Sequence, residues 1–284
     1  MANLSWLFYK GYYIRFDRWL EIDSKDKGVK KVIAEFFEKQ NEAFYAYTQR
    51  YNLTTPGKDR EELKTTYPGL LFGSGYTHET GAAGELKIGL QLDYTTGQPV
   101  IPGSSVKGAL RAVFPQFEKD DKQPWKIKDL DKETGISIEK ALYVARLLSL
   151  PYEGNELYEK VHELELHIFE GLDVDKSREK GTAVYHSIYN RDIFHDAFPV
   201  KGGEGNKIFG PDSITPHTKG PLKEPVPLLF LKVLPKVTYA FNYQLNAPAW
   251  ENTDAIKRKM LYKEILTTTG LGAKTNVGYG QFNA

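Results

Sequence analysis

The amino-acid sequence predicts an α+β protein with a ferredoxin-like (RRM-like) fold. Segments typical of strands and helices follow one another in the order strands, helix, long insertion, strands, helix, strand, which is the split β-α-β arrangement. Apolar residues alternate along 86–92 and 237–245 with the period of strands buried on one face. Apolar residues recur at helical spacing in 103–113 and 252–268. We expect both helices to cover one face of the sheet and to leave the other face open to a ligand.

The composition indicates an ordinary globular protein. Its 284 residues are enough for one large domain or two smaller ones. We expect a single domain over 1–284, with a helical N-terminal extension to about residue 55 and a charged helical insertion over about 118–180. There is no cysteine, which excludes disulfides and thiolate metal sites and is typical of a reducing compartment.

Charge and hydropathy limit the classes of partner. Lys and Arg number 38 against 37 for Asp and Glu, so any contact with nucleic acid must be local rather than driven by a global cationic field. No apolar run approaches the roughly 20 residues that cross a bilayer, and the first residues lack the features of a signal peptide. We expect a cytoplasmic protein without membrane contact.

The first fifty residues predict an aromatic segment followed by a long helix. The stretch 4–16 is rich in aromatic residues, and we expect it to dock on the rest of the chain. A helix is predicted from a cap at Asp23 or Ser24 to about Tyr51. Its buried face repeats every three or four residues and comprises Val29, Val32, Ile33, Phe36, Phe44, Tyr47 and Tyr51.

A glycine-rich segment near the C-terminus, 270–282, is a candidate ligand loop. Consecutive free N–H groups in such a loop form an anion-binding concavity, and glycine inside a strand indicates close approach of a backbone or a ligand. The alternative is a tight connection between helix and strand in which glycine only caps and turns. The residues concerned are Gly270, Gly272, Lys274, Thr275, Asn276, Gly278, Tyr279 and Gly280.

A second candidate element lies at 103–111. Ser104 or Ser105 is a natural N-cap for the helix that follows, and Lys107 and Arg111 lie four residues apart on it. Free N–H groups, the helix dipole and two cations would together suit a phosphate. The alternative is a capped helix with an exposed Lys/Arg pair that has no ligand. If both elements bind one ligand, they must meet at one groove.

A long loop is predicted between Lys201 and Pro227. The segment is rich in Gly and Pro, and loops of that length without structure of their own are usually functional or disordered. It carries Lys207, His217, Lys219 and Lys223.

Two motifs together resemble the paired signature of the RAMP superfamily of CRISPR-associated proteins. They are Ile101-Pro-Gly-Ser-Ser-Val-Lys-Gly-Ala-Leu-Arg111 and Gly270-Leu-Gly-Ala-Lys-Thr-Asn-Val-Gly-Tyr-Gly-Gln-Phe282. Further stretches are similar to the sixth-subunit family of the type III-B Cmr effector complex. These are the opening Asn3-Leu-Ser-Trp-Leu-Phe-Tyr9, then Phe194-His-Asp-Ala-Phe-Pro199, and then Thr215-Pro-His217 followed by Pro225-Val-Pro-Leu-Leu-Phe-Leu231. The resemblance spans nearly the whole chain and is poorest over the insertion.

This resemblance implies a non-catalytic subunit at the head of a RAMP filament, near the 3′ part of the guide RNA. Its implied partners are guide and target RNA, other RAMP subunits and the small helical subunit of the Cmr complex. The segment 201–227 would be a thumb-like projection between guide and target. We expect no metal or cofactor. The implied RNA-binding residues are Ser104, Ser105, Lys107, Arg111, Gly270, Gly272, Lys274, Thr275, Asn276, Gly278, Tyr279 and Gly280.

The sequence also allows two enzymatic alternatives. A metal-independent endoribonuclease of the same superfamily, processing CRISPR RNA, would need a histidine, and His78 is the best candidate. His162 and His167 lie five apart, which is not the spacing of a helical metal pair. The sequence Gly-Leu-Gly-Ala-Lys-Thr275 superficially resembles a P-loop, but Ala273 stands where glycine is required, and the loop follows a helix rather than a strand.

Overall fold

The computed structural model describes residues 3–14, 16, 27–49, 57–73, 80, 82–87, 89–132, 135–215, 227–251 and 253–284. Its centre is a five-stranded antiparallel sheet of β1 (Asp59–Thr65), β2 (Asp192–Phe194), β3 (Phe198–Lys201), β6 (Thr238–Leu245) and β7 (Phe282–Asn283). The order is β2-β6-β1-β7, with β3 also paired to β6. With β2 and β3 taken as halves of one broken strand, the order is that of a ferredoxin-like fold, which confirms the predicted fold class.

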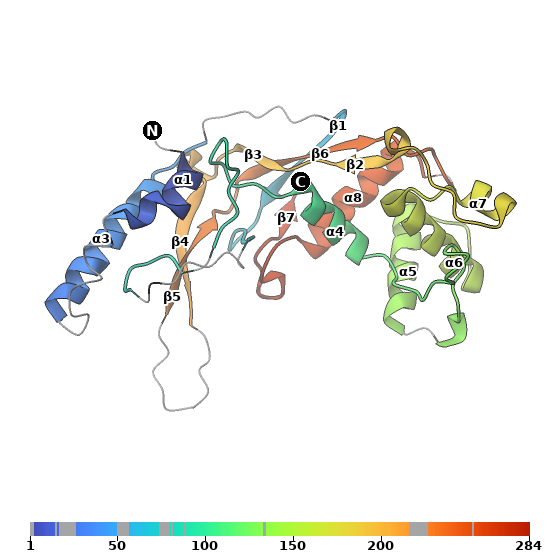
Figure 1. Cartoon of the computed structure of the whole chain (residues 1–284), viewed down its shortest axis with the longest axis horizontal. Helices are drawn as coiled ribbons and strands as arrows, with labels where there is room; N and C mark the ends of the chain where they lie inside the picture. Colours follow the sequence, from blue (N-terminus) through green and yellow to red (C-terminus); the bar gives the residue numbers. More distant parts are fainter. Residues whose placement is uncertain are drawn as a thin grey trace.

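Two helices, α4 (Gly103–Ala112) and α8 (Ala255–Thr269), cover one face of this sheet (Figure 1). The alternating aromatic residues of β6 point to that face. The ring of Tyr243 lies 5.5 Å from that of Tyr262 on α8, and the ring of Phe241 lies 5.5 Å from that of Phe282. Burial of these rings holds the helices against the sheet.

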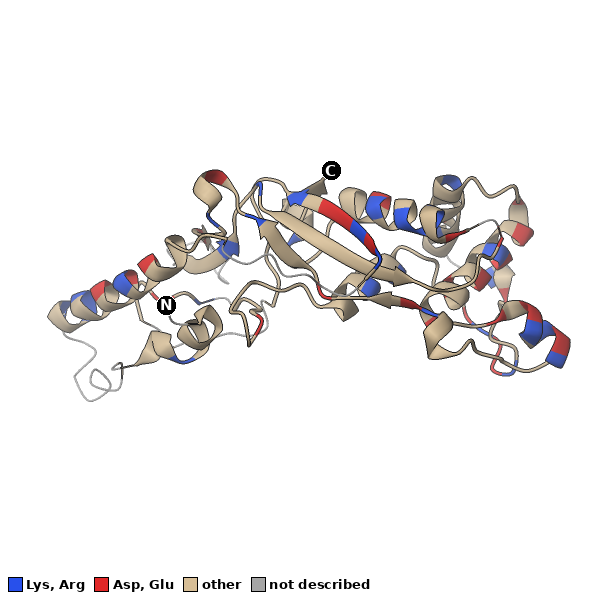
Figure 2. Cartoon of the chain, turned by 90° about the horizontal axis from the view of Figure 1, so that it is seen from above, with Lys and Arg blue, Asp and Glu red and all other residues tan. Residues whose placement is uncertain are grey.

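The opposite face of the sheet is open along β1. Arg60, Glu62 and Lys64 are exposed there and carry charges of both signs, which alternate along the strand in Figure 2. On the neighbouring β6, Ala240 and Asn242 occupy the same face but are buried. The face predicted to be open is therefore accessible along β1 and closed along β6.

The first strand of the sheet was not anticipated from the sequence. Five of the seven residues of β1 are charged, in the sequence DREELKT, so no apolar alternation marks it. The predicted strand at 86–92 does bury Leu86, Leu90 and Leu92. It lies outside both sheets, however, because the only pairings described near it are isolated bridges such as that between Leu92 and Pro99.

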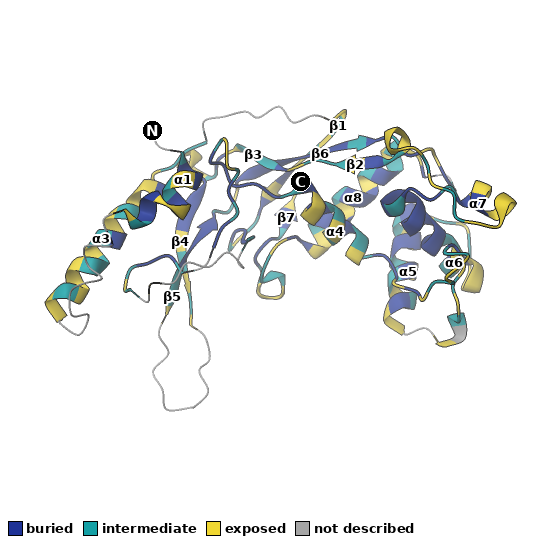
Figure 3. Cartoon of the chain, viewed as in Figure 1, coloured by how far each residue is buried: buried dark blue, intermediate teal, exposed yellow. Residues whose placement is uncertain are grey.

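The N-terminal aromatic segment docks as predicted. Helix α1 (Leu4–Tyr9) and the 3₁₀ turn η1 (Gly11–Tyr13) pack on α3 (Lys27–Tyr45). The ring of Phe8 lies 5.6 Å from that of Phe44, and the ring of Tyr12 lies 5.1 Å from that of Phe37. Figure 3 shows the far part of α3 largely exposed.

The predicted helix extends too far at its C-terminal end, because α3 ends at Tyr45. The proposed caps Asp23 and Ser24, and Tyr51 itself, lie outside the described residues. Val32 is exposed rather than buried.

The prediction of a long loop at 201–227 is wrong over the first half of this segment. After the short turn η5 (Glu204–Asn206), strand β4 (Phe209–Ile214) pairs antiparallel with β5 (Leu228–Val233) as a two-stranded sheet. The proline of β4, Pro211, fits because a two-stranded sheet has only edge strands. His217, Lys219 and Lys223 lie outside the described residues.

The segment predicted as a charged helical insertion, about 118–180, contains several helices. It comprises η2 (Leu130–Lys132), α5 (Gly135–Leu148), α6 (Gly154–Glu165), the π-helix η3 (Leu166–Glu170) and α7 (Val174–Lys180), and the short turn η4 (Ile188–Asn190) follows it. These helices form one end of the molecule, and α3 forms the other (Figure 1). Within the ranges that the structure describes, no helix is long and apolar enough to cross a bilayer.

Candidate nucleic-acid interface

The glycine-rich loop between α8 and β7 folds against the chain that follows β1. The Leu271 amide donates to the Gly280 carbonyl at 2.8 Å, and the Gly280 amide donates to the Gly69 carbonyl at 2.8 Å. The Ala273 amide donates to the Leu71 carbonyl at 2.7 Å. Both ends of the loop are therefore held by the protein's own backbone.

This packing explains three of the predicted glycines. Gly270, Gly272 and Gly280 all have positive φ. A Cβ at Gly272 would lie 2.3 Å from the Leu71 carbonyl oxygen, and one at Gly280 would lie 2.1 Å from the Leu271 carbonyl oxygen. Close backbone approach thus requires glycine at these positions without any ligand. An RNA contact by these three residues stays a prediction.

The tip of the loop is partly exposed and carries candidate backbone donors. It comprises Lys274 in the left-handed conformation, with φ 61°, the 3₁₀ turn η6 (Thr275–Val277) and Gly278. Among the described residues, no backbone group accepts from the amides of Lys274, Thr275 or Asn276, and no carboxylate pairs with the Lys274 ammonium. Successive free N–H groups beside a free ammonium form a site for an anion.

Tyr279 is buried in the loop and is not a free aromatic platform. It is 6% exposed, and its hydroxyl donates to Asp212 Oδ2 of β4 at 2.6 Å. Burial, and then this hydrogen bond, raise the pKa of Tyr279. Lys232 of β5 donates to the same Oδ2 atom at 2.6 Å. Tyr279 therefore ties the loop to the β4–β5 sheet, which the sequence analysis did not anticipate.

The N-terminus of α4 is capped by a distant carboxylate. The Gly103 amide donates to Asp196 Oδ1 at 2.7 Å, and neither Ser104 nor Ser105 makes a capping hydrogen bond. The predicted serine cap is therefore wrong. Because Asp196 already places a negative charge at this helix terminus, the terminus is not an empty phosphate site.

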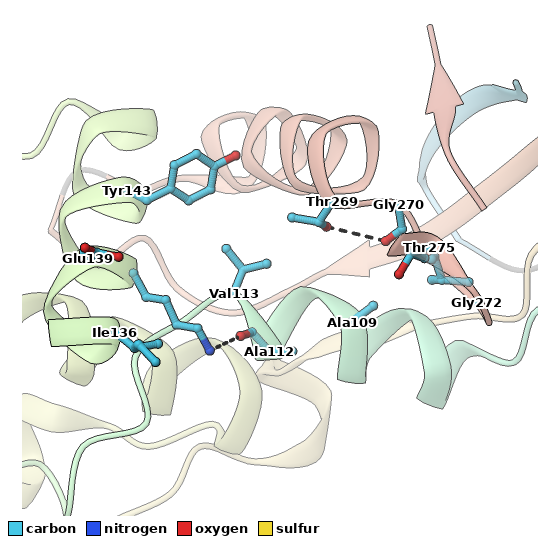
Figure 4. Close-up of a pocket in the computed structure, with 12 residues that line it drawn as sticks. Ala109, Ala112, Val113, Ile136, Glu139, Tyr143, Thr269, Gly270, Gly272 and Thr275 are labelled. Carbon is cyan, nitrogen blue, oxygen red and sulfur yellow. Dashed lines mark hydrogen bonds between the residues drawn. The ribbon is translucent and has the colours of Figure 1, made fainter. Parts of the chain in front are cut away.

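The two predicted elements do lie side by side. Ser105 and Ala109 of α4 line a cavity of about 450 Å³ together with Gly272 of the loop. A second cavity, of about 620 Å³, lies between α4, the loop and α5 (Figure 4). Its labelled lining residues include Ala112, Val113, Tyr143, Thr269, Gly270 and Thr275. The expectation that the glycine-rich loop and the 103–111 element meet at one groove agrees with this arrangement.

The two cations of α4, however, point away from that groove. At 100° per residue, Lys107 and Arg111 are rotated by about 200° and 240° from Ser105 around the helix axis. Arg111 instead pairs with the insertion, with Nε 2.5 Å from Glu165 Oε1 and Nη2 2.5 Å from Glu170 Oε1. The expectation that Lys107, Arg111 and the loop line the same groove is therefore wrong.

Lys107 lies beside other cations on the side of α4 that faces away from the groove. Partial burial lowers the pKa of Lys107, and the positive charges of Arg111 and Arg191 lower it further. Among the described residues no carboxylate pairs with it. The small side chains of Ser104, Gly108 and Ala112 form the exposed outer face of α4 between Lys107 and the loop.

The histidines of the insertion have structural partners. His162 Nε2 lies 2.9 Å from the Pro124 carbonyl oxygen, and burial lowers the pKa of His162 to about 4. His167 contacts the carbonyl oxygens of Leu172 and Pro248 through its two ring nitrogens. Among the described residues, no group of three or more His, Asp or Glu side chains could hold a metal ion. His78 lies outside the described residues.

One exposed residue next to the loop was missed at the sequence level. Tyr67 follows β1 and is 84% exposed. Pro68, its neighbour, lies against the loop tip, because a Cβ at Gly278 would be 3.3 Å from Pro68 Cδ. The available signal was an aromatic residue directly before Pro-Gly after a charged segment, but the strand β1 itself was not recognised.

Comparisons with known proteins agree with this fold. A chain of the cryo-EM structure of the type III-B Cmr-beta bound to cognate target RNA aligns with a TM-score of 0.54 and 18% identity, over 99% of this chain and 90% of that one. The crystal structure of Cmr6 from Pyrococcus furiosus aligns with a TM-score of 0.43 and 21% identity, over 81% and 99% of the two chains. Comparison with curated protein sequences finds no match.

The family follows from the sequence match rather than from these distant structures, of which the first supports the fold alone. The family model of the RAMP superfamily matches residues 62–283. That range begins in β1 and ends in β7, so it contains both candidate elements and all of the central sheet except the first three residues of β1. The protein belongs to the RAMP superfamily.

Proposed function

We propose that the protein is a non-catalytic RNA-binding subunit of a type III-B CRISPR (Cmr) ribonucleoprotein, similar to its sixth subunit. It would bind the guide RNA backbone near its 3′ part, at the head of the filament, and contribute to antiviral RNA targeting. Its partners would be guide and target RNA, other RAMP subunits and the small helical subunit. Family membership and the fold shared with a chain of an RNA-bound Cmr assembly support this proposal.

The observation that carries the proposal is the set of donors at the loop tip without acceptors in the described part of the chain. The amides of Lys274, Thr275 and Asn276 have no backbone acceptor among the described residues, and the Lys274 ammonium in the same turn has no carboxylate partner there. Amides and an ammonium bind a phosphate without reading the base, as a subunit that carries guides of any sequence requires. A near-neutral chain with one such local site suits a subunit that holds only a few nucleotides of a shared RNA.

The path of the RNA in this proposal crosses α4. From the loop tip the backbone would pass over the uncharged outer face at Ser104 and Gly108 and reach Lys107 on the other side of the helix. Arg111 contributes indirectly, because its ion pairs with Glu165 and Glu170 hold the insertion against α4. A direct contact between Arg111 and RNA is not part of the proposal.

The proposal is tested by RNA binding at several salt concentrations. We expect Lys274→Glu to weaken binding of a single-stranded guide-like RNA and to reduce the slope of log K against log salt by about 0.7, the value for one phosphate contact. Lys180→Glu on α7 is the matched control, because Lys180 is exposed and, like Lys274, has no carboxylate partner among the described residues. Equal binding and equal salt slopes for Lys274→Glu and the wild type would overturn the proposal.

A further inference from the structure

A third cavity, of about 610 Å³, has Tyr67 as one wall. It is lined by Tyr67, Lys207, Leu234, Lys236 and the Glu204–Gly205 turn, together with Pro235. We propose that this cavity binds one unpaired nucleotide of single-stranded RNA, with the base on the Tyr67 ring and the adjoining phosphates at Lys207 and Lys236. This inference rests on the proposed function, because the same RNA strand would reach the cavity from the loop tip.

The Tyr67 ring is suited to stacking by its exposure and its support. It is 84% exposed, although it is a large ring next to a packed loop. Lys232 Nζ lies 6.0 Å from the ring centroid, and that ammonium is itself held by Asp212 at 2.6 Å. An exposed ring on a rigid support is the platform on which proteins stack unpaired bases.

The two lysines supply uncompensated positive charge at the edge of the cavity. Lys207 and Lys236 are both exposed, and within the described part of the chain neither pairs with a carboxylate. The backbone of Lys236 is fixed, because its amide donates to the Thr65 carbonyl at 2.7 Å. Glu204 also lines the cavity, so two cations face one carboxylate and the local charge remains positive.

Apolar side chains complete the site for a nucleotide rather than a free anion. Leu234 and Pro235 line the cavity together with the two lysines and give a base or ribose an apolar surface. A site for inorganic phosphate would need no aromatic platform. A protein-docking surface would need a larger continuous apolar patch than these residues form.

The Tyr67 wall of the cavity is linked to the glycine-rich loop through Lys232 and Pro68. Lys232 Nζ lies 5.9 Å from the Tyr279 ring centroid and 6.0 Å from that of Tyr67, so it stands between the loop and the exposed ring. Pro68 contacts the same loop near Gly278. Tyr67 therefore neighbours the loop that carries Lys274, as binding of one strand at both places requires.

The test uses the full chain and a single-stranded RNA that carries 5-iodouridine at successive positions. We expect irradiation to cross-link one iodouridine position to Tyr67, identified by mass spectrometry of the peptide. Tyr67→Ala is expected to weaken RNA binding about tenfold, the usual loss for one stacked base. Tyr67→Phe is expected to bind within twofold of the wild type. The double variant Lys207→Glu/Lys236→Glu is expected to bind RNA more weakly than the wild type.

The controls are Tyr189→Ala, which removes another exposed tyrosine, and Lys180→Glu. Both are expected to bind RNA as the wild type does. If Tyr67→Ala and the double lysine variant bind normally while Lys274→Glu binds weakly, the nucleotide site is refuted and the proposed function stands. If Lys274→Glu also binds normally, the proposed function itself fails. Normal RNA binding together with loss of partner subunits in the Tyr67 variant would assign the ring to a protein contact and refute the inference.

Thermal unfolding of each variant separates lost folding from lost binding. The side chains of Lys207 and Lys236 are exposed, so their double variant is expected to unfold at the wild-type temperature. Should Tyr67→Ala fail to fold, the cross-link on the wild-type chain and the affinity of the double lysine variant decide the question. Absence of a cross-link at Tyr67 together with wild-type affinity of the lysine variant would overturn the inference.

Discussion

The amide of Gly103 donates a 2.7 Å hydrogen bond to the carboxylate of Asp196, and the two residues are 93 positions apart in the sequence. The contact joins α4, which covers the sheet, to the connection between β2 and β3. Glycine is required there, because a Cβ at Gly103 would lie 2.0 Å from the Phe194 carbonyl oxygen. The motif that begins α4 is therefore shaped first by packing against its own chain.

Asp196→Ala is expected to lower the free energy of unfolding by about 1 kcal/mol, because the helix loses its capping carboxylate. Urea titration measures the change. Asp196→Asn keeps an oxygen acceptor and should lose less than the alanine variant. Equal stability of Asp196→Ala and the wild type would contradict a capping role.

Gly272→Ala is expected to cost about 3 kcal/mol, because the added Cβ meets the Leu71 carbonyl and φ is +108°. Gly108→Ala is the matched control on exposed α4, where a Cβ meets nothing within 4 Å. The control should stabilise the protein by about 0.5–1 kcal/mol through helix propensity. Chemical denaturation of both variants checks the prediction, and similar effects would contradict it.

Arg111→Met is expected to destabilise the protein by about 3 kcal/mol, because Glu165 is 2% exposed and would remain as a buried charge without its partner. Arg60→Ala removes the exposed pair with Glu62 and should cost less than about 1 kcal/mol. If Arg111 acts only through the insertion, a folded Arg111→Met variant should bind RNA as the wild type does. A large change in its salt slope would instead indicate a phosphate contact.

His162 is expected to make stability depend on pH in the acid range. Its pKa is lowered from 6.5 to about 4 in the folded state, so between these values the unfolded chain binds the extra proton. This contribution is complete above pH 6.5 and is lost as the pH falls to about 4, a change on the order of 3 kcal/mol. Unfolding of the wild type and of His162→Phe across pH 4–7 measures it, and parallel pH profiles would contradict the assignment.

Sequence periodicity was sufficient for much of the architecture. The alternation at 237–245 and the helical spacing at 103–113 and 252–268 correspond to β6, α4 and α8. The charged insertion was recognised because amphipathic helices carry their pattern locally. Two strands were not predicted. β1 lacks apolar alternation because five of its seven residues are charged, and β4 contains Gly and Pro, which are typical of loops.

For the candidate site, too, some features can be predicted from the sequence and others cannot. A sequence motif locates Lys107, Arg111 and Tyr279 along the chain, but which neighbour covers each side chain depends on contacts between distant segments. The fold directs Arg111 to Glu165 and Glu170, and Tyr279 to Asp212. Local residue order therefore established the family fold, and it located the glycine-rich loop and the 103–111 element along the chain. Long-range packing decided which amides and cations remain free for a ligand, because burial and pairing are set by residues far apart in the chain.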